Sequence, residues 1–267
     1  MSARSINERH AIEVRKVAKV YVSNGNAVHA IKEASFDVPD SAFVSLIGPS
    51  GCGKSTLLKM IGGLDRATAG EIRYQGEVVE GLNRDVGYVP QNDQLLPWRS
   101  VAGNVGIGLE FRGQSRTEIK VRVEELLRLI GLTAFADHIP SQLSGGMRKR
   151  VSLVRAFAYS PRCLLMDEPF GALDAQMKSV LQRELLRIWE GHSQTIVFVT
   201  HDIEEAILLS DMIVVMSKPP SVIKTIERVD LARPRDLQRD KFQPAFQALY
   251  SRLWSSIDQD LAATEHG

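Results

Sequence analysis

Residues 48–56 read Gly48-Pro49-Ser50-Gly51-Cys52-Gly53-Lys54-Ser55-Thr56. This segment, the phosphate loop, matches the pattern G-x-x-x-x-G-K-[ST] at every fixed position. An apolar run typical of a buried strand precedes it at residues 43–47, and an apolar stretch typical of a helix start follows at 55–61. The glycines let successive backbone N–H groups point at one anion, and the helix N-terminus adds partial positive charge. The segment therefore predicts a nucleotide site on a strand–loop–helix unit rather than a plain glycine-rich turn.

Three side chains of the phosphate loop have expected roles. Lys54 supplies a positive charge for the β- and γ-phosphates of a nucleotide, and Ser55 offers a hydroxyl to Mg²⁺. Cys52 lies beside Lys54 at the predicted helix N-terminus, where the pKa of a thiol is lowered. We therefore expect Cys52 to be reactive and its alkylation to block nucleotide binding.

Composition is that of an ordinary soluble globular protein. The chain has 267 residues, of which 44% are hydrophobic and 24% are charged, which allows an enzyme-sized core. The 33 basic and 32 acidic residues nearly cancel, so no overall field favours nucleic acid, and we expect no nucleic-acid partner. The local run Arg148-Lys149-Arg150 is expected to be solvated.

Cysteine content and hydropathy bear on location. Two cysteines argue against a disulfide framework and favour a reducing compartment such as the cytosol. The sequence shows neither an N-terminal apolar signal segment nor a run of about 18 apolar residues. Any membrane role is therefore expected to come through a partner.

Two further stretches carry groups suited to phosphate chemistry. Leu143-Ser144-Gly145-Gly146-Met147 opens a predicted helix, whose N-terminus with Ser144 as cap can bind a second anion, although a capped helix without a ligand would look similar. Residues 163–168 read as a buried strand that ends in Asp167 and Glu168. One carboxylate can hold the shell of a magnesium ion while its neighbour orients water as a base, and the alternative is a surface acidic pair.

Three single residues stand at the ends of predicted strands. Tyr21 alone reads as a sheet or core residue, although its ring can stack on a nucleotide base. Gln91 stands at the exit of a short strand, where its side chain can touch a metal-bound water. His201 follows a β-branched strand, at the edge where parallel sheets collect ligands, so we expect a phosphate contact there.

The remaining patterns concern surface and packing. The apolar loop Leu95-Leu96-Pro97-Trp98-Arg99-Ser100-Val101 either folds inward or forms an exposed docking patch, and from sequence alone we expect burial. A capping box formed by Ser115 and Glu118 predicts a helix with one buried stripe, which Gly131 ends. Near the C-terminus, a helical stripe is expected to pack back on the body, and it consists of Phe242, Phe246, Leu249, Tyr250, Leu253, Trp254 and Ile257.

Taken together, these motifs resemble the ATPase subunit of ATP-binding cassette transporters over roughly residues 11–230. The residues that carry the resemblance are Gly48 to Thr56, Gln91, Leu143 to Met147, Leu164 to Glu168, Ala172-Leu173-Asp174 and His201. The resemblance implies catalytic roles for Glu168, His201 and Gln91, and metal contacts for Ser55, Gln91 and Asp167. It implies nucleotide binding by Tyr21, Gly48, Pro49, Ser50, Gly51, Cys52, Gly53, Lys54, Ser55, Thr56, Ser144, Gly145, Gly146 and Asp174.

Three details of the sequence narrow the subfamily. Met147 stands where the commonest family pattern has glutamine, and it leaves the phosphate contacts of Ser144 and the glycine amides in place. Three segments resemble the corresponding segments of cassettes that serve nitrate, sulfonate and taurine importers. They are residues 95–101, Gly146-Met147-Arg148 and Arg233-Pro234-Arg235.

The expected fold is an α/β P-loop NTPase with a mainly parallel core sheet, an antiparallel N-terminal β-subdomain and an inserted helical subdomain at about 92–160. The ATPase domain would span 11–230, and residues 231–267 would form a C-terminal helical extension. By the resemblance, two copies sandwich ATP and Mg²⁺, with Lys54 of one copy and Ser144 of the other on each nucleotide.

The resemblance implies that ATP hydrolysis powers solute uptake through a separate membrane permease. The permease would dock near Leu95–Trp98 at the cytoplasmic face of the inner membrane, and a periplasmic solute-binding protein would act indirectly. One alternative is a soluble cassette ATPase in repair or translation. Another is an inactive binding module, which would be expected to lack Lys54, Asp167 or Glu168, and all three are present.

Overall fold

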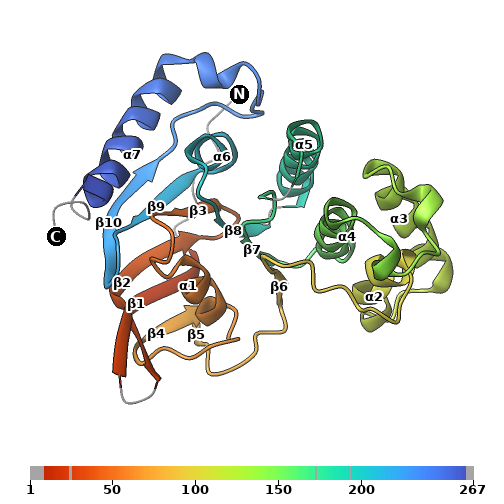
Figure 1. Cartoon of the computed structure of the whole chain (residues 1–267), viewed down its shortest axis with the longest axis horizontal. Helices are drawn as coiled ribbons and strands as arrows, with labels where there is room; N and C mark the ends of the chain where they lie inside the picture. The colour runs from red at the N-terminus through yellow and green to blue at the C-terminus, as the bar shows by residue number, and fades with distance from the viewer. Residues whose placement is uncertain (1–8, 24–25, 172, 193, 263–267) are drawn as a thin grey trace. The chain divides into compact units, whose positions relative to one another are not determined.

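The computed structural model describes residues 9–23, 26–171, 173–192 and 194–262, and Figure 1 traces the chain. Asn24, Gly25 and Ala172 lie outside the described residues. The chain divides into two compact units. The first unit runs to Arg84 and resumes at Ser193, and the second unit is Asp85–His192.

The N-terminal part of the first unit is an antiparallel sheet, as predicted. Its strands are β1 (His10–Ser23), β2 (Asn26–Pro39), β4 (Ala69–Tyr74) and β5 (Glu77–Val78). Strand β1 pairs antiparallel with β2 on one side and with β4 on the other, and Val14 lies opposite both Phe36 and Ile72. All three of these side chains are buried. Because a shift of one residue would turn them to the other face of the sheet, their burial fixes the pairing register of the three strands.

The rest of the first unit is the mainly parallel sheet that carries the phosphate loop. Its central strand β3 (Phe43–Ile47) pairs in parallel with β8 (Thr195–Val199) and β9 (Met212–Met216), and β10 (Ser221–Arg228) runs antiparallel beside β9. Every residue of β3, β8 and β9 is buried, as expected of parallel strands with both faces covered. The strand order within this unit is β5-β4-β1-β2-β10-β9-β3-β8, and its helical elements are α1 (Lys54–Ile61), α6 (Ile203–Leu209), η3 (Asp240–Phe242) and α7 (Pro244–Ala262).

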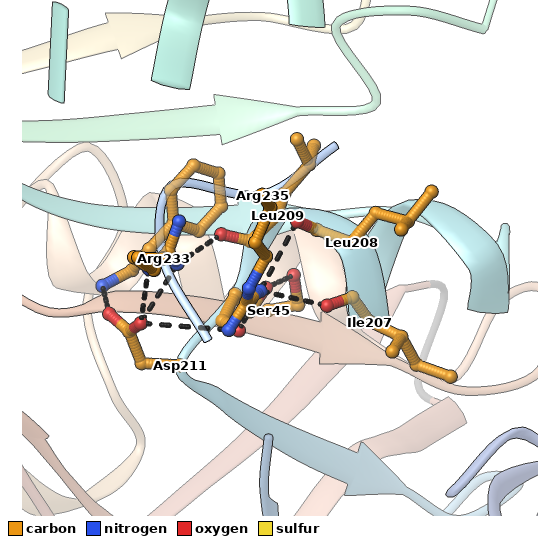
Figure 2. Close-up of polar contacts among 9 residues, drawn as sticks. Ser45, Ile207, Leu208, Leu209, Asp211, Arg233 and Arg235 are labelled. Carbon is orange, nitrogen blue, oxygen red and sulfur yellow. Dashed lines mark hydrogen bonds and ion pairs between the residues drawn. The ribbon is translucent and has the colours of Figure 1, made fainter. Parts of the chain in front are cut away.

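The C-terminal segment of the first unit is joined to α6 by buried arginine contacts (Figure 2). Arg235, whose side chain is 1% exposed, donates hydrogen bonds to the carbonyl oxygens of Ile207 (2.8 Å), Leu208 (3.2 Å) and Ser210 (2.5 Å). The last carbonyl groups of a helix lack intrahelical partners, so the guanidinium caps α6 at its C-terminal end. Arg233 donates to Asp211 Oδ1 and to the Leu209 carbonyl, each at 2.8 Å.

Helix α7 then packs along α6 (Figure 1). The predicted stripe is confirmed at Phe246, Leu249 and Leu253, which are buried in one cluster with residues of α6, while Tyr250 and Ile257 are partly buried there. The prediction is wrong for the other two members of the stripe. Phe242 precedes the helix in η3 and is 75% exposed, and Trp254 is 55% exposed.

The second unit combines one parallel strand pair with the remaining helices. Strands β6 (Val86–Val89) and β7 (Cys163–Asp167) pair in parallel. The predicted capping box is present, because Ser115 N donates to Glu118 Oε2 at 2.9 Å and Glu118 N donates to Ser115 Oγ at 3.3 Å. The helical elements are α2 (Val101–Phe111), α3 (Arg116–Leu129), η1 (Thr133–Phe135), η2 (Pro140–Gln142), α4 (Gly145–Ala158) and α5 (Ala175–His192).

Within the described ranges of both units, no helix has the length and apolar character needed to cross a membrane.

Candidate functional site

The phosphate loop connects β3 to α1, as the sequence predicts. Gly48, Gly51 and Gly53 adopt positive φ angles of 153°, 75° and 97°. A Cβ at Gly48 would lie 2.6 Å from the carbonyl oxygen of Met216, so this backbone approach requires glycine. The loop thereby bends into the N-terminus of α1, where backbone N–H groups and the helix dipole favour an anion.

Lys54 is the first residue of α1 and is buried within the loop. Its ammonium group donates to the carbonyl oxygens of Gly48 at 2.8 Å and Pro49 at 2.9 Å. These bonds hold the positive charge inside the concave side of the loop. Ser55 and Thr56 follow in the first turn of the same helix.

The prediction for Cys52 is wrong. The thiol is fully buried, and burial raises its pKa more than the nearby Lys54 ammonium, 3.8 Å from the sulfur, lowers it. A neutral, enclosed thiol is a poor nucleophile. The sequence places Cys52 correctly in the loop, but it does not show that the loop closes over the sulfur.

Tyr21 lies in β1 and is not a core residue, because its side chain is 42% exposed. Its hydroxyl donates to Asp65 Oδ2 at 3.0 Å and lies 3.3 Å from Thr56 Oγ1, at the end of the phosphate loop. The Lys19 ammonium is 4.7 Å from the ring centre and donates to Asp65 Oδ1 at 2.6 Å. Burial would raise the pKa of Asp65, but hydrogen bonds from Lys19, the Arg66 backbone and Tyr21 lower it overall. The structure therefore fixes an exposed aromatic ring beside the loop, and the supporting residues Lys19 and Asp65 were missed from sequence.

His201 lies in the turn after β8, which pairs in parallel with β3, so His201 and Gly48 stand at the same edge of the sheet. Its side chain is exposed. The turn is held by Thr200, whose hydroxyl donates to the buried Glu205 at 2.5 Å and accepts from Asp202 N at 3.0 Å. Thr200 and Glu205 were also missed, although Asp202 ahead of two glutamates is a helix-start signal.

In the second unit, Gln91 and Glu168 lie together. Gln91 Nε2 donates to Glu168 Oε2 at 3.2 Å. Asp167 is the last residue of β7 and is 3% exposed, whereas Glu168 is half-buried and has a φ of 45°. Left-handed backbone is uncommon for a residue other than glycine and is concentrated at functional sites. The predicted carboxylate pair is therefore split into a buried acid and a partly accessible one.

Lys149 is a third member of this group, and the expectation that residues 148–150 are solvated is wrong. Lys149 is 4% exposed and donates to the carbonyl oxygens of Pro90 at 3.2 Å and Gln91 at 2.8 Å. Burial lowers the pKa of Lys149, and the charges of Asp167, Asp93 and Glu168 oppose that change. Lys149 shares a helical face with Leu153 and Ala156, both buried, and this spacing was the available signal.

The other predicted residues of the second unit stand at helix starts. Ser144 caps α4, where its Oγ accepts from Met147 N at 3.3 Å, and Ser144 and Gly145 are exposed. Asp174 is exposed and caps α5, where Oδ1 accepts from Met177 N at 2.9 Å. Both helix starts can receive an anion.

The expectation that the apolar loop at 95–101 is buried holds for Val101 but is wrong for Pro97 and Trp98, while Leu95 and Leu96 are half-buried. Trp98 is 75% exposed, and Pro97 is also exposed. The loop is nevertheless fixed, because the fully buried Asn104 accepts from Leu96 N at 2.8 Å and donates to the carbonyl oxygens of Leu96, Arg99 and Ser100 at 3.0–3.1 Å. The structure thus holds a large aromatic side chain in solvent.

Each unit holds an oxygen donor of the kind that a hard metal ion takes alongside phosphate. The described residues contain no group of three His, Cys, Asp or Glu side chains placed to hold a metal. Mg²⁺ commonly takes one or two protein oxygens and completes its shell with phosphate and water. The hydroxyl of Ser55 and the buried carboxylate of Asp167 are ligands of this kind.

Comparison with known proteins gives concordant matches. The ABC transporter family matches residues 31–171. The taurine import ATP-binding protein TauB of Rhizobium johnstonii is 46% identical over 235 residues, covering 86% of this chain and 89% of that protein. The aliphatic sulfonates import ATP-binding protein SsuB of Bacillus cereus is 40% identical over 232 residues, covering 87% and 91%. A solved dimeric structure of the ATP-binding cassette MJ0796 with ADP and Pi is similar with a TM-score of 0.75 and 32% identity, covering 83% of this chain and 100% of that one.

Proposed function

Because the chain belongs to the ABC transporter family, we propose that it is the ATP-hydrolysing subunit of an importer and drives solute uptake through a separate membrane permease. The observation that carries the enzymatic part is the half-buried Glu168, whose carboxylate is held by Gln91 at the end of a buried strand. The relatives are named as import subunits, which favours transport over a role in repair or translation.

The first unit supplies the groups that bind the nucleotide. Backbone N–H groups from Gly48 to Thr56 surround the phosphates, and Lys54 turns its ammonium group from the loop carbonyls to the β- and γ-phosphates. Tyr21, exposed beside Thr56, stacks on the base. Ser55 would help to hold Mg²⁺, which would supply positive charge to the phosphates. His201 contacts the γ-phosphate from the neighbouring strand end.

The second unit supplies the groups that activate water. Glu168 accepts a proton as the water oxygen attacks the γ-phosphorus and the bond to the leaving ADP oxygen breaks. Gln91 orients this carboxylate, and Gln91 and Asp167 would also help to hold the metal ion. The buried Lys149 holds the Gln91 backbone in place through its carbonyl group.

We further propose that the working form is a dimer, as in the dimeric cassette structures to which this chain is similar. The exposed helix start at Ser144, Gly145 and Gly146 of one copy then contacts the ATP on Lys54 of the other copy. Asp174 lies at the same contact. The exposure of Ser144 and Gly145 supports this arrangement.

Docking to the permease is assigned to the patch Leu95–Trp98, within the helical subdomain proposed for about 92–160. An exposed tryptophan on a loop fixed by Asn104 is a suitable interface anchor. Next to it, Arg99 pairs with Glu110 at 2.7 Å, and Glu110 lines a hollow of about 670 Å³ between α2 and α3. The proposed position of the subunit is therefore peripheral, at the cytoplasmic face of the inner membrane.

The solute class proposed is the sulfonate, taurine and nitrate type, with a periplasmic solute-binding protein acting upstream. Deletion of the gene should abolish uptake of at least one of taurine, an alkanesulfonate or nitrate by the native host, and the parent chain should restore it while Lys54→Ala should not. Unchanged uptake of all three solutes would refute the solute class. Hydrolysis of ATP by the purified chain tests the enzymatic part separately.

A further inference from the structure

A pocket of about 360 Å³ lies within the first unit, between the turn after β8 and the last turns of α7. This volume is within the range of small-ligand sites. Ile203, Tyr250 and Ile257 give it an apolar wall, and His201 contributes to its rim. Of its lining residues, only His201 has a role in the proposed handling of ATP.

The two elements that form the pocket are anchored. Phe246 and Leu249 of α7 are buried against α6, and Arg235 caps the far end of α6 (Figure 2). Thr200 and Asp202 hold the turn that carries His201. The pocket is therefore built on packed helices and a hydrogen-bonded turn, which position a ligand more accurately than a free loop.

The wall on α7 is a stacked aromatic pair. The rings of Tyr250 and Trp254 have centroids 6.2 Å apart and planes 12° from parallel. Trp254 is 55% exposed, so part of its ring is available to an occupant. A tryptophan face is the most favourable aromatic surface for an organic cation.

The charged groups that line the pocket have one sign. Asp202, Glu204 and Asp258 contribute carboxylates, and no lysine or arginine lines it in the described part of the chain. Asp202 also accepts the backbone N–H groups of Glu204 and Glu205 as the cap of α6. Glu204 and Asp258 are exposed and give the pocket its negative edge. An aromatic wall with a carboxylate edge is complementary to a positive group on an apolar stem.

We propose that this pocket binds a small organic cation, with a guanidinium or ammonium group on a short apolar chain, and that its occupancy slows ATP hydrolysis. The regulatory half of this proposal, that an occupied pocket slows hydrolysis, rests on the proposed function, because the bound cation acts through His201. A cation held beside the imidazole restrains the turn that carries His201 from approaching the phosphate. The binding half stands on the pocket alone.

The test uses butylguanidinium as the probe and the neutral, similarly shaped butylurea as its control. Isothermal titration of the whole chain without nucleotide should show binding of butylguanidinium in the millimolar range and much weaker binding of butylurea. Added butylguanidinium should reduce the hydrolysis rate of the parent chain. Equal binding of the two compounds, or no binding of either, would overturn the proposal.

Variants locate the site. Trp254→Ala should weaken binding of butylguanidinium roughly fivefold or more, and Asp258→Asn should weaken it by a similar factor, with basal hydrolysis retained. Phe242→Ala removes a more exposed aromatic side chain outside the pocket and should leave binding unchanged. If Trp254→Ala and Asp258→Asn both bind as the parent does, the cation binds elsewhere and the assignment is wrong. Binding to the parent chain with unchanged hydrolysis would overturn the regulatory half.

Discussion

Replacement of Glu168 by glutamine separates catalysis from binding. The carboxylate accepts a hydrogen bond from Gln91 at 3.2 Å, and a glutamine of the same size keeps a carbonyl oxygen for that bond. We therefore expect the free energy of unfolding to change by about 1 kcal/mol or less. Loss of the proton acceptor should slow hydrolysis ~10²–10⁴-fold, which corresponds to about 3–5 kcal/mol of transition-state stabilisation.

The assay is phosphate release at saturating ATP, together with direct measurement of ATP binding. Glu184→Gln is the matched control, because Glu184 is paired with Arg187 on α5 and has no role in the proposed chemistry. Lys54→Ala should instead lose nucleotide binding. A Glu168→Gln chain that hydrolyses ATP at the parental rate, or that loses ATP binding, would refute the role of Glu168 as the base.

The same variant reports on the dimer. Because a closed dimer persists only while ATP is intact, Glu168→Gln should elute as a dimer on gel filtration with ATP. Adding Ser144→Arg should abolish that dimer, since the larger cation would obstruct the phosphates on the other copy. A variant that binds ATP and stays monomeric would leave the sandwich arrangement without support for the isolated subunit.

Three further changes test separate parts of the structure. Trp98→Ala should leave the thermal midpoint within about 2 °C of the parent, because the side chain is 75% exposed. The same variant should weaken capture of the chain by permease-containing membranes about tenfold or more. A much larger fall in the midpoint would contradict the exposed position. Maleimide should modify Cys52 in the folded chain at least about tenfold more slowly than in urea, because the thiol is buried and its pKa is raised. Rapid inactivation by maleimide that ATP prevents and that Cys52→Ala abolishes would contradict this. Arg235→Met should lower the free energy of unfolding by about 3 kcal/mol, because it leaves the α6 carbonyl groups without a donor. The control Arg239→Met removes a side chain that is 90% exposed and should change the free energy of unfolding by roughly 0.5 kcal/mol or less. Equal midpoints in urea for the two variants would show that the cap is not needed.

Much of the fold could be predicted from the sequence because its signals are local. The strand, glycine-rich loop and helix around Lys54 follow from a fixed pattern, and the capping box at Ser115 follows from spacing. The buried strands β3 and β8 are short apolar runs, which parallel packing requires. These features need no knowledge of distant contacts.

The errors concern side chains whose surroundings come from distant parts of the chain. The neighbouring Lys54 predicts a lowered pKa for Cys52, but burial of the thiol has the larger effect and raises it. The charged run around Lys149 predicts a surface position, although the carbonyl groups of Pro90 and Gln91, far away in sequence, accept hydrogen bonds from its ammonium group. The apolar character of Trp98 predicts burial, yet the side chain is exposed on a loop whose backbone is hydrogen-bonded to Asn104.

The cap on α6 also bears on where the chain can be cut. A truncation after residue 230, at the proposed end of the ATPase domain, removes both Arg233 and Arg235 and the whole of α7. The carbonyl groups at Ile207, Leu208 and Ser210 would then face solvent, and the apolar side of α6 would lose its cover. Fraying of this short helix would reach the turn that carries His201, only two residues before its start. A minimal fragment chosen by sequence motifs alone would thus keep every nucleotide-binding residue and still lose the support beneath one of them.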